Sequence, residues 1–461
     1  NLRWSDAFTL SDDFKANLAL NPLQSFFSSL KFRHSTYDIN KVKSAWPLMA
    51  DYLGIENKPG SELLFERDIK YPDTASGKPN VVLVICESFS MYKSSMAGNP
   101  LNTTPYFNEL CNKGVFFERC FTPAYGTARG VWAAITGIPD VEMPRTASRN
   151  PAAVNQHTII NDFKGYTPFY FLGGNPTWAN IQGLLSNNIS GLKLYQQDNF
   201  NAKKIDVWGI SDKNLLLEAN GILKNHPGNF FAIIQTADNH RPYTIPDEDK
   251  ARFKLMDYPS DSLHRYGFEN NDELNAFRYT DFCFEQFMEA AKKEKYFNNT
   301  IFVFVGDHGI RGNAGDMLPE AYTKEGLVCE HVPLLFYAPS MLAPKRSDRI
   351  SSQVDILPSI ASLAKVSYRN TTLGRNLFDS SSQQEHLAFI IDHDVKSIGM
   401  VSGSYYYLRN LESAKEEFVS IKRNEDARTP KADTARKYLS AMTSAWFETA
   451  KYLLLNNKKK N

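Results

Sequence analysis

The chain has 461 residues, of which 42% are hydrophobic and 13% aromatic, and this composition excludes a disordered chain. The 52 Lys and Arg residues balance 51 Asp and Glu residues, so the sequence lacks the basic excess of a nucleic-acid-binding protein. Its apolar runs are far shorter than the roughly 20 residues of a membrane-spanning helix. The five cysteines have no CxxC spacing, which argues against a zinc knuckle or a redox pair. We therefore expect a globular protein with a large core.

The first 75 residues begin with Asn1 rather than Met and are polar and irregular in pattern. They predict an arm or linker that wraps on the main domain and that follows a membrane anchor or a signal segment upstream of Asn1. The main domain is predicted to span residues 76–385. A small third unit is predicted over residues 386–461.

Short apolar runs rich in β-branched and aromatic residues recur through the main domain. Each is continuous rather than alternating, which predicts strands buried on both faces of a sheet. They cover residues 81–85, 169–172, 230–234, 301–305 and 334–337. Helical spacing lies between them, over residues 275–295 and after the N-cap candidate Asp355. Strands that alternate with helices predict an α/β fold with a mostly parallel central sheet flanked by helices.

The third unit predicts a small antiparallel sheet followed by a helix. Its strand-like runs cover residues 387–391, 398–401, 405–408 and 417–421. An amphipathic helix then carries Leu439, Met442 and Trp446 and ends in a basic tail, Lys458-Lys459-Lys460. The tail suits the negative end of the helix dipole, and contact with an anionic membrane surface is the alternative.

Metal-binding residue types follow several of the predicted strands. Glu87 follows the first run, His240 lies shortly after the third, and Asp307-His308 follow the fourth between two glycines. Because open parallel sheets bind ligands beyond the carboxyl ends of their strands, these side chains are predicted to converge. Two carboxylates with imidazole nitrogen suit zinc or manganese. The alternatives are a helix cap for Glu87 and a hydrogen-bonded surface imidazole for His240.

A second acidic and histidine cluster, Asp392-His393-Asp394, follows the run at 387–391. It lacks the glycines that flank Asp307-His308. We therefore predict that it opens the C-terminal sheet rather than binding a metal.

Thr127 is the candidate nucleophile. It lies between Gly126 and Gly130, directly before a predicted helix. A hydroxyl at a helix N-terminus lies where backbone N–H groups hold an anionic group. Coordination to a divalent metal lowers the pKa of such a hydroxyl and activates it. The alternative is that Thr127 only caps the helix.

Taken in chain order, these motifs resemble those of the alkaline phosphatase superfamily. They are the run ending in Glu87-Ser88-Phe89, then Thr104-Pro105, Gly126-Thr127, Gly306-Asp307-His308 and Val332-Pro333. The order is that of the sulfatase family, and the resemblance is strongest to its branch of lipoteichoic acid synthases and phosphoglycerol transferases, over roughly residues 76–380. It implies one divalent metal ion, manganese first and zinc or magnesium as alternatives. The ligands that it implies are Glu87, Thr127, Asp307 and His308.

The resemblance also implies roles around the metal. Thr127 matches the nucleophile that accepts a phosphoglycerol group, and His240 matches a histidine near the phosphate and the leaving group. Trp178 matches a tryptophan of the head-group pocket, to which Arg129 and Asn180 are also assigned as substrate-binding residues.

The sequence departs from this branch at two places. Ala179-Asn180 stand where the branch has Asn-Arg after the tryptophan, and Leu172-Gly173-Gly174 stand where it has a histidine. Arg129 is expected to compensate electrostatically. Cys120-Phe121-Thr122-Pro123-Ala124 has its proline one place late for a sulfatase nucleophile motif and lacks the following arginine, so sulfuric ester hydrolysis is not expected.

The resemblance therefore implies a metal-dependent phosphoglycerol transferase. The head group of a membrane phospholipid, phosphatidylglycerol, moves through phospho-Thr127 to a glycan or polyol-phosphate acceptor, and diacylglycerol is released. Such a donor implies the extracytoplasmic domain of a cytoplasmic membrane protein, on the periplasmic or cell-surface side. The alternatives are a phosphoethanolamine transferase, a phosphodiesterase or phosphatase of the same superfamily, and an inactive lipid- or glycan-binding module.

Overall fold

Eight strands form the central sheet of the computed structural model, which describes residues 36–55, 63–72, 78–143, 145–381 and 384–459. Their spatial order is β5-β4-β6-β2-β7-β8-β3-β9. In that order they span Lys193–Tyr195, Thr167–Leu172, Phe230–Gln235, Asn80–Cys86, Thr300–Gly306, His331–Tyr337, Val115–Phe121 and Lys345–Ser352. Only β8 runs antiparallel to its neighbours. The predicted mostly parallel sheet is confirmed.

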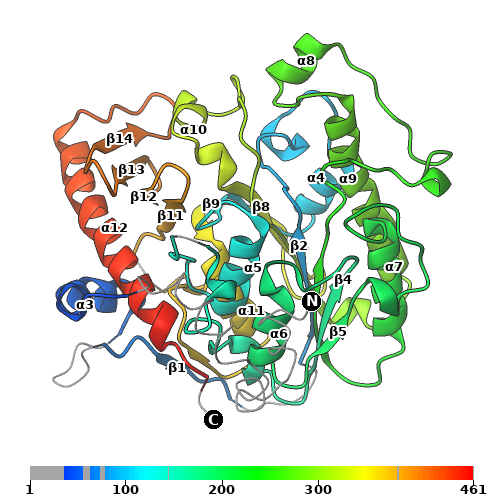
Figure 1. Ribbon diagram of the computed structural model, residues 1–461, viewed down its shortest axis with the longest axis horizontal. Helices are drawn as coiled ribbons and strands as arrows, with labels where there is room; N and C mark the ends of the chain where they lie inside the picture. Colours follow the sequence, from blue (N-terminus) through cyan, green and yellow to red (C-terminus); the bar gives the residue numbers. More distant parts are fainter. Residues whose placement is uncertain (1–35, 56–62, 73–77, 144, 382–383, 460–461) are drawn as a thin grey trace, which may run out of the picture.

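Helices cover both faces of this sheet (Figure 1). On one side lie α3 (Ile39–Leu53), α5 (Thr127–Thr136), α6 (Ile181–Asn188), α11 (Ile356–Leu363) and α12 (Pro430–Asn456). On the other side lie α4 (Pro105–Cys111), α7 (Asp212–Lys224) and α9 (Asn271–Ala291). The shorter helices α8 and α10 span Ser260–Arg265 and Glu320–Lys324.

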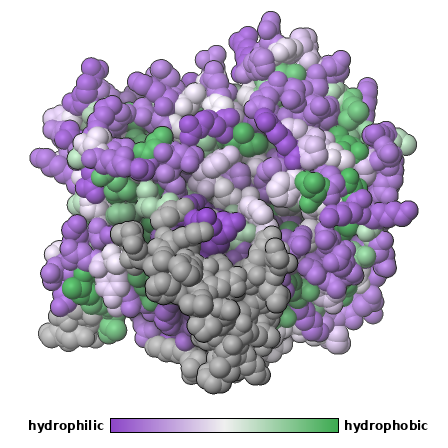
Figure 2. All heavy atoms as spheres, in the orientation of Figure 1, coloured by the Kyte–Doolittle hydropathy of each residue, from purple (hydrophilic) through white to green (hydrophobic). Residues whose placement is uncertain are grey.

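The five predicted apolar runs, which lie in β2, β4, β6, β7 and β8, are buried on both faces, as their continuous apolarity predicts. In β2 the side chains of Val81, Leu83 and Ile85 enter one core. Those between them, Val82, Val84 and Cys86, enter the other core. All five cysteines are buried and unpaired, and Cys86 and Cys283 are part of the hydrophobic core. The face seen in Figure 2 is mostly hydrophilic, with apolar side chains scattered over it.

The C-terminal unit is a four-stranded antiparallel sheet with α12 packed against it, as predicted. Its strands are β11 (Ala388–Asp392), β12 (Ser397–Val401), β13 (Tyr405–Asn410) and β14 (Glu416–Ser420). The Trp446 ring of α12 stacks on Phe389 of β11, with 6.0 Å between the ring centroids.

Part of the segment predicted to be an irregular arm has regular structure. The helix α3 buries Val42, Trp46, Met49 and Leu53, whose spacing of three or four residues is the helical pattern that the polar surroundings obscure. A short strand, β1 (Arg67–Ile69), pairs with β10 (Tyr368–Asn370). Residues 1–35 of the predicted arm lie outside the described residues.

The topology brings four strand ends together. Strands β2, β3, β6 and β7 run in one direction, so their carboxyl ends lie at one edge of the sheet. The C-terminal sheet reaches the same edge, because the Ile391 N–H donates to the Pro123 carbonyl at 2.8 Å, just before Thr127. Among the described helices, none has the length and apolarity needed to cross a membrane.

Candidate active site

Three buried side chains at this edge form a cluster with metal-ligand chemistry. Glu87 follows β2, and Asp307 and His308 follow β7. One ligand atom of each lies within 4.8 Å of the others. Their exposed fractions are only 5%, 0% and 5%, respectively. The predicted convergence of these three residues is therefore present in the fold.

Hydrogen bonds orient the two carboxylates and leave one oxygen unpaired. The backbone N–H groups of Ser88 and His308 donate to Asp307 Oδ1 at 2.7 and 2.6 Å. The Ser88 hydroxyl donates to Glu87 Oε1 at 2.7 Å. Asp307 Oδ2 is buried and has no hydrogen-bond partner among the described residues. A buried carboxylate oxygen without a partner is unfavourable by itself, and its position suits a cation ligand.

The imidazole of His308 is oriented for ligation. Its Nδ1 lies 2.6 Å from the Gly309 carbonyl, which only accepts hydrogen bonds. In the neutral ring Nδ1 therefore carries the proton, and the lone pair of Nε2 faces Glu87 and Asp307 at 3.8 and 3.6 Å.

Electrostatics also favours a cation here. Burial, and then the charge of Asp307, raise the pKa of Glu87 well above its ordinary value. Two carboxylates this close and this dry cannot both ionise at low cost unless a positive charge lies between them. Two carboxylates and one imidazole suit a borderline-hard divalent ion such as Zn²⁺ or Mn²⁺. The residues present thus fit the divalent metal of the superfamily that the sequence resembles.

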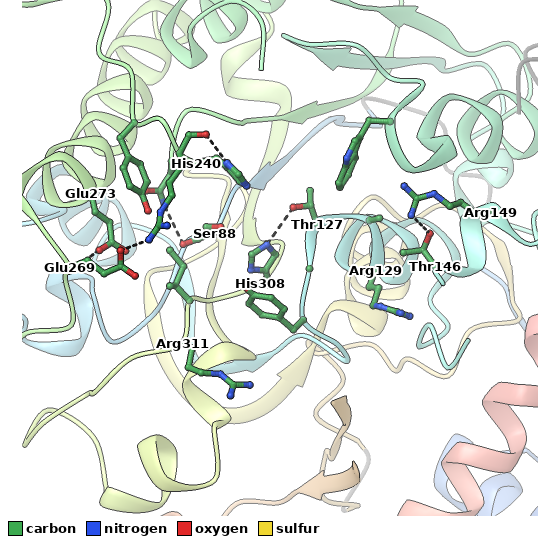
Figure 3. A pocket seen from close by; sticks show the side chains of 18 residues that line it. Ser88, Thr127, Arg129, Thr146, Arg149, His240, Glu269, Glu273, His308 and Arg311 are labelled. Carbon is green, nitrogen blue, oxygen red and sulfur yellow. Dashed lines mark hydrogen bonds and ion pairs between the residues drawn. The ribbon is translucent and has the colours of Figure 1, made fainter. Parts of the chain in front are cut away.

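Thr127 is the first residue of α5, and its hydroxyl lies against this cluster. It donates to Glu87 Oε2 at 3.1 Å, and its Oγ1 lies 3.3 Å from His308 Nε2 (Figure 3). The preceding Gly126 has φ +102°, a conformation that side-chain-bearing residues rarely adopt. Thr127 therefore does more than begin a helix near the site, because its hydroxyl contacts two of the predicted metal ligands directly.

Two connected cavities open on Thr127. The larger, of about 540 Å³, is lined by the predicted residues Arg129, Trp178 and His240 together with Thr127 and His308. The smaller, of about 170 Å³, shares Thr127, Trp178 and His240 with the larger one. It is also lined by Glu87 and has apolar walls that include Leu172, Ile181 and Val207. Trp178 lies at the rim, where 44% of its surface is exposed.

His240 is an exposed side chain at the junction of the two cavities. Its ring packs on Trp208, with 4.2 Å between the ring centroids, and its Nδ1 lies 2.9 Å from the Arg241 carbonyl. These contacts orient the imidazole beside the nucleophile, and Nε2 is the nitrogen left for a substrate.

Two residues assigned to the substrate pocket have protein partners. The Arg129 guanidinium lies 3.0 Å from the Asp140 carboxylate and donates to the Glu142 carbonyl at 3.1 Å. Asn180 is buried, donates to the Ser148 carbonyl at 2.6 Å, and does not line either of the two cavities described above. Its side chain instead binds the backbone of the segment that contains Ser148. Substrate binding by Asn180 therefore stays a prediction.

Two further residues of the larger cavity, Tyr125 and Arg149, were not predicted from the sequence. The Tyr125 ring lies over His308, with 4.6 Å between the ring centroids. Because Tyr125 directly precedes Gly126-Thr127, its position in the sequence could have predicted a place in the site. Arg149 lines the cavity from a short 3₁₀ helix (Ala147–Arg149), and no local sequence pattern marks it.

Fold and site together define an α/β enzyme domain with its reactive hydroxyl and an acidic-histidine cluster at one sheet edge. The sulfatase family model matches residues 79–366, and the chain belongs to the sulfatase family.

Curated relatives agree with the resemblance seen in the motifs. The lipoteichoic acid synthase-like protein YvgJ of Bacillus subtilis strain 168 is 22% identical over 403 residues, which cover 81% of this chain and 61% of the relative. Lipoteichoic acid synthase 2 of the same strain is 24% identical over 380 residues, 77% of this chain and 55% of the relative. This chain thus spans less than two thirds of the length of these relatives.

Solved structures confirm the fold. A protein of the alkaline phosphatase superfamily from Vibrio parahaemolyticus superposes with a TM-score of 0.71 at 21% identity, covering 92% of this chain and 99% of that one. The lipoteichoic acid synthase LtaP from Listeria monocytogenes superposes with a TM-score of 0.69 at 18% identity, covering 90% and 100%.

Proposed function

We propose that this protein is a metal-dependent phosphoglycerol transferase that uses Thr127 as its nucleophile. The observation that carries the proposal is the position of the Thr127 hydroxyl, 3.1 Å from Glu87 and 3.3 Å from His308 at the floor of an open cavity. The similarity to lipoteichoic acid synthases supports phosphoryl transfer over sulfate-ester hydrolysis.

Glu87, Asp307, His308 and Thr127 are the proposed metal ligands, and Mn²⁺ is the proposed ion. When bound, a divalent ion lowers the pKa of a coordinated hydroxyl and stabilises the charge on phosphoryl oxygens. The buried, unpaired Asp307 Oδ2 supports this assignment.

The side chains then divide the transfer into two displacements. Thr127 Oγ1 forms a bond to phosphorus, its proton passes to Glu87, and the bond from phosphorus to the diacylglycerol oxygen breaks. His240 is proposed to protonate that leaving oxygen. In the second step an acceptor hydroxyl gives its proton to His240 and attacks phosphorus, and the Thr127 oxygen leaves and recovers its proton from Glu87.

The donor is proposed to be phosphatidylglycerol, and the acceptor a glycan or a polyol phosphate. The smaller cavity supports a lipid donor, because its apolar walls at Leu172, Ile181 and Val207 suit the glycerol backbone that leaves with the acyl chains. Such a substrate supports an extracytoplasmic catalytic domain over residues 76–385, linked through residues 1–75 to a membrane anchor and followed by the unit at 386–461.

The decisive experiment is mass spectrometry of the intact protein after incubation with Mn²⁺ and phosphatidylglycerol. The wild type is expected to gain one phosphoglycerol group on Thr127 and to release diacylglycerol. Thr127→Ala is expected to do neither, while Thr434→Ala, an exposed threonine of α12, serves as the matched control. Full diacylglycerol release by Thr127→Ala would show that the nucleophile is wrong. Release by the wild type without transfer to any acceptor would identify a phosphodiesterase instead.

A further inference from the structure

Trp208 contacts His240, the proposed proton donor, in two ways. The two rings pack together, with 4.2 Å between their centroids and an angle of 56° between their planes. The Trp208 Nε1–H also donates to the Arg241 carbonyl at 2.7 Å, and His240 Nδ1 lies 2.9 Å from that same oxygen. The indole therefore touches one face of the imidazole and binds the carbonyl that accepts its hydrogen bond.

The backbone at Trp208 packs against the residues that follow β4. The Ile210 N–H donates to the Gly173 carbonyl at 3.0 Å. A Cβ at Gly209 would lie 1.9 Å from the oxygen of that carbonyl, and a Cβ at Gly174 would lie 2.3 Å from the Trp208 carbonyl oxygen. Glycine permits so close an approach of two backbones because it has no Cβ. The end of β4 therefore fixes where the indole starts.

A second set of hydrogen bonds joins the start of α7 to the residues before His240. The Asp212 carboxylate accepts from the backbone N–H groups of Ala237 and Asp238 at 2.8 and 3.0 Å. In return, the Asp238 carboxylate accepts from the Asp212 N–H at 2.7 Å. Both side chains are buried. Because each carboxylate binds the backbone of the other segment, residues 208–212 and 237–241 are held together at both ends.

These contacts decide which ring nitrogen of His240 is available in the pocket that it shares with Thr127 (Figure 3). The Arg241 carbonyl only accepts hydrogen bonds, so Nδ1 carries the proton in the neutral ring. Nε2 is then free to take a proton from an acceptor hydroxyl and, once protonated, to give it to the leaving oxygen. Rotation of the ring would break the bond to Arg241 and exchange the two nitrogens.

We propose that Trp208 is a positioning residue for the proton transfers of His240. It acts through the Arg241 carbonyl, which keeps the proton on Nδ1, and through the ring contact, which keeps Nε2 turned toward the phosphorus to be attacked by Thr127. The inference rests on the proposed function in one respect, the role of His240 as the group that gives and takes the proton.

The test compares two donors that differ in their need for an acid. Phosphatidylglycerol loses the diacylglycerol oxygen, which needs a proton, whereas glycerophospho-p-nitrophenol loses p-nitrophenolate, which leaves without one. Release of each leaving group is measured in a single turnover of the Mn²⁺-loaded protein. Trp208→Ala is expected to slow diacylglycerol release by about tenfold to a hundredfold and to leave p-nitrophenolate release close to the wild-type rate. Equal slowing of both donors would show a merely structural role and overturn the proposal.

Three further variants separate this role from others. Trp208→Phe keeps a ring against His240 and loses only the N–H donor, so it is expected to slow diacylglycerol release by about twofold to tenfold. Trp208 also lines the smaller cavity, and the double variant with His240→Ala controls for that contact. If Trp208 acts through His240, adding Trp208→Ala to His240→Ala slows release no further, and an additional loss overturns the proposal. Lys204→Ala, at an exposed residue of the same loop, is the control that keeps both rates.

The tautomer of His240 gives a readout that needs no turnover. Nitrogen-15 NMR is recorded on histidine-labelled protein with Mg²⁺ in place of the paramagnetic Mn²⁺, and the His240 signals are assigned by their loss in His240→Gln. The neutral ring is expected to be the Nδ1–H tautomer in the wild type and a mixture of both tautomers in Trp208→Ala. An unchanged tautomer in Trp208→Ala overturns the positioning role. Absence of diacylglycerol release from the wild type instead overturns the proposed function, while the NMR result still decides whether Trp208 orients His240.

Discussion

Replacing Gly130 by Ala tests whether the contact between helix α5 and the Asp307 segment sets the site geometry. A Cβ at this position would lie 2.3 Å from the Asp307 carbonyl oxygen and 2.9 Å from its carbonyl carbon. Both are backbone atoms, so no side-chain rotation relieves the overlap. The helix that begins with Thr127 and the segment that carries Asp307 and His308 must therefore move apart.

The size of the movement follows from the distances. Ordinary van der Waals contact begins at 3.4 Å, so the separation must grow by about 1 Å. Thr127 Oγ1 lies 3.3 Å from His308 Nε2, and such a shift breaks that contact. A misplacement of about 1 Å between reacting groups costs about a hundredfold in rate. The overlap itself is expected to destabilise the fold by roughly 1–3 kcal/mol.

The assay is the rate of diacylglycerol release from phosphatidylglycerol, with urea unfolding measured on the same preparations. Gly221→Ala in α7 is the matched control, since a Cβ there has no heavy atom within 4 Å. That control is expected to keep its activity and to gain about 0.5–1 kcal/mol, because alanine is the better helix residue. A folded Gly130→Ala protein that works at the wild-type rate would refute the claim that this contact positions the nucleophile.

Three further outcomes are expected. Removing the divalent ion with a chelator should lower Tm, because Glu87 and Asp307 then repel each other, and adding Mn²⁺ should restore it; an unchanged Tm would count against the metal site. Lys93→Met leaves Glu273 buried without its counter-charge and should cost about 3–5 kcal/mol in urea unfolding, much of it recovered in the double variant with Glu273→Leu. Burial raises the pKa of Asp281 from 3.8 to about 7, so the folded state holds a proton that the unfolded chain releases first. Its contribution to stability should therefore fall as pH rises from about 4 to 7, and Asp281→Asn should flatten that slope in urea titrations.

Much of the site was predictable because strand ends are encoded locally. An apolar run buried on both faces predicts a strand of a covered parallel sheet, and the residue after it lies at the functional edge. Glu87, Asp307 and His308 each follow such a run directly. Thr127 was marked by its two neighbouring glycines, of which Gly126 adopts a positive φ that favours glycine.

Elements whose stability depends on distant partners were missed. The strand β3 has Glu118 and Arg119 in its middle, which interrupts the apolar run. The edge strand β9 is mostly polar, and β3 is its one partner among the described strands. Neither strand has the continuous apolar run of a buried strand. Each is stabilised instead by hydrogen bonds to strands remote in the sequence, and such partners leave no local signal.

The amino-acid sequence by itself determined the α/β class, the C-terminal sheet and helix, and the identity of the residues that follow the central strands. These properties depend on hydrophobic periodicity, which is a short-range signal. Only the tertiary structure decided that the Thr127 hydroxyl contacts Glu87 and that Asp140 pairs with Arg129. It also placed Arg149 among the residues that line the larger cavity. Each of these arrangements joins residues from separate segments of the chain. No single segment therefore encodes them, and they become visible only when the chain is folded.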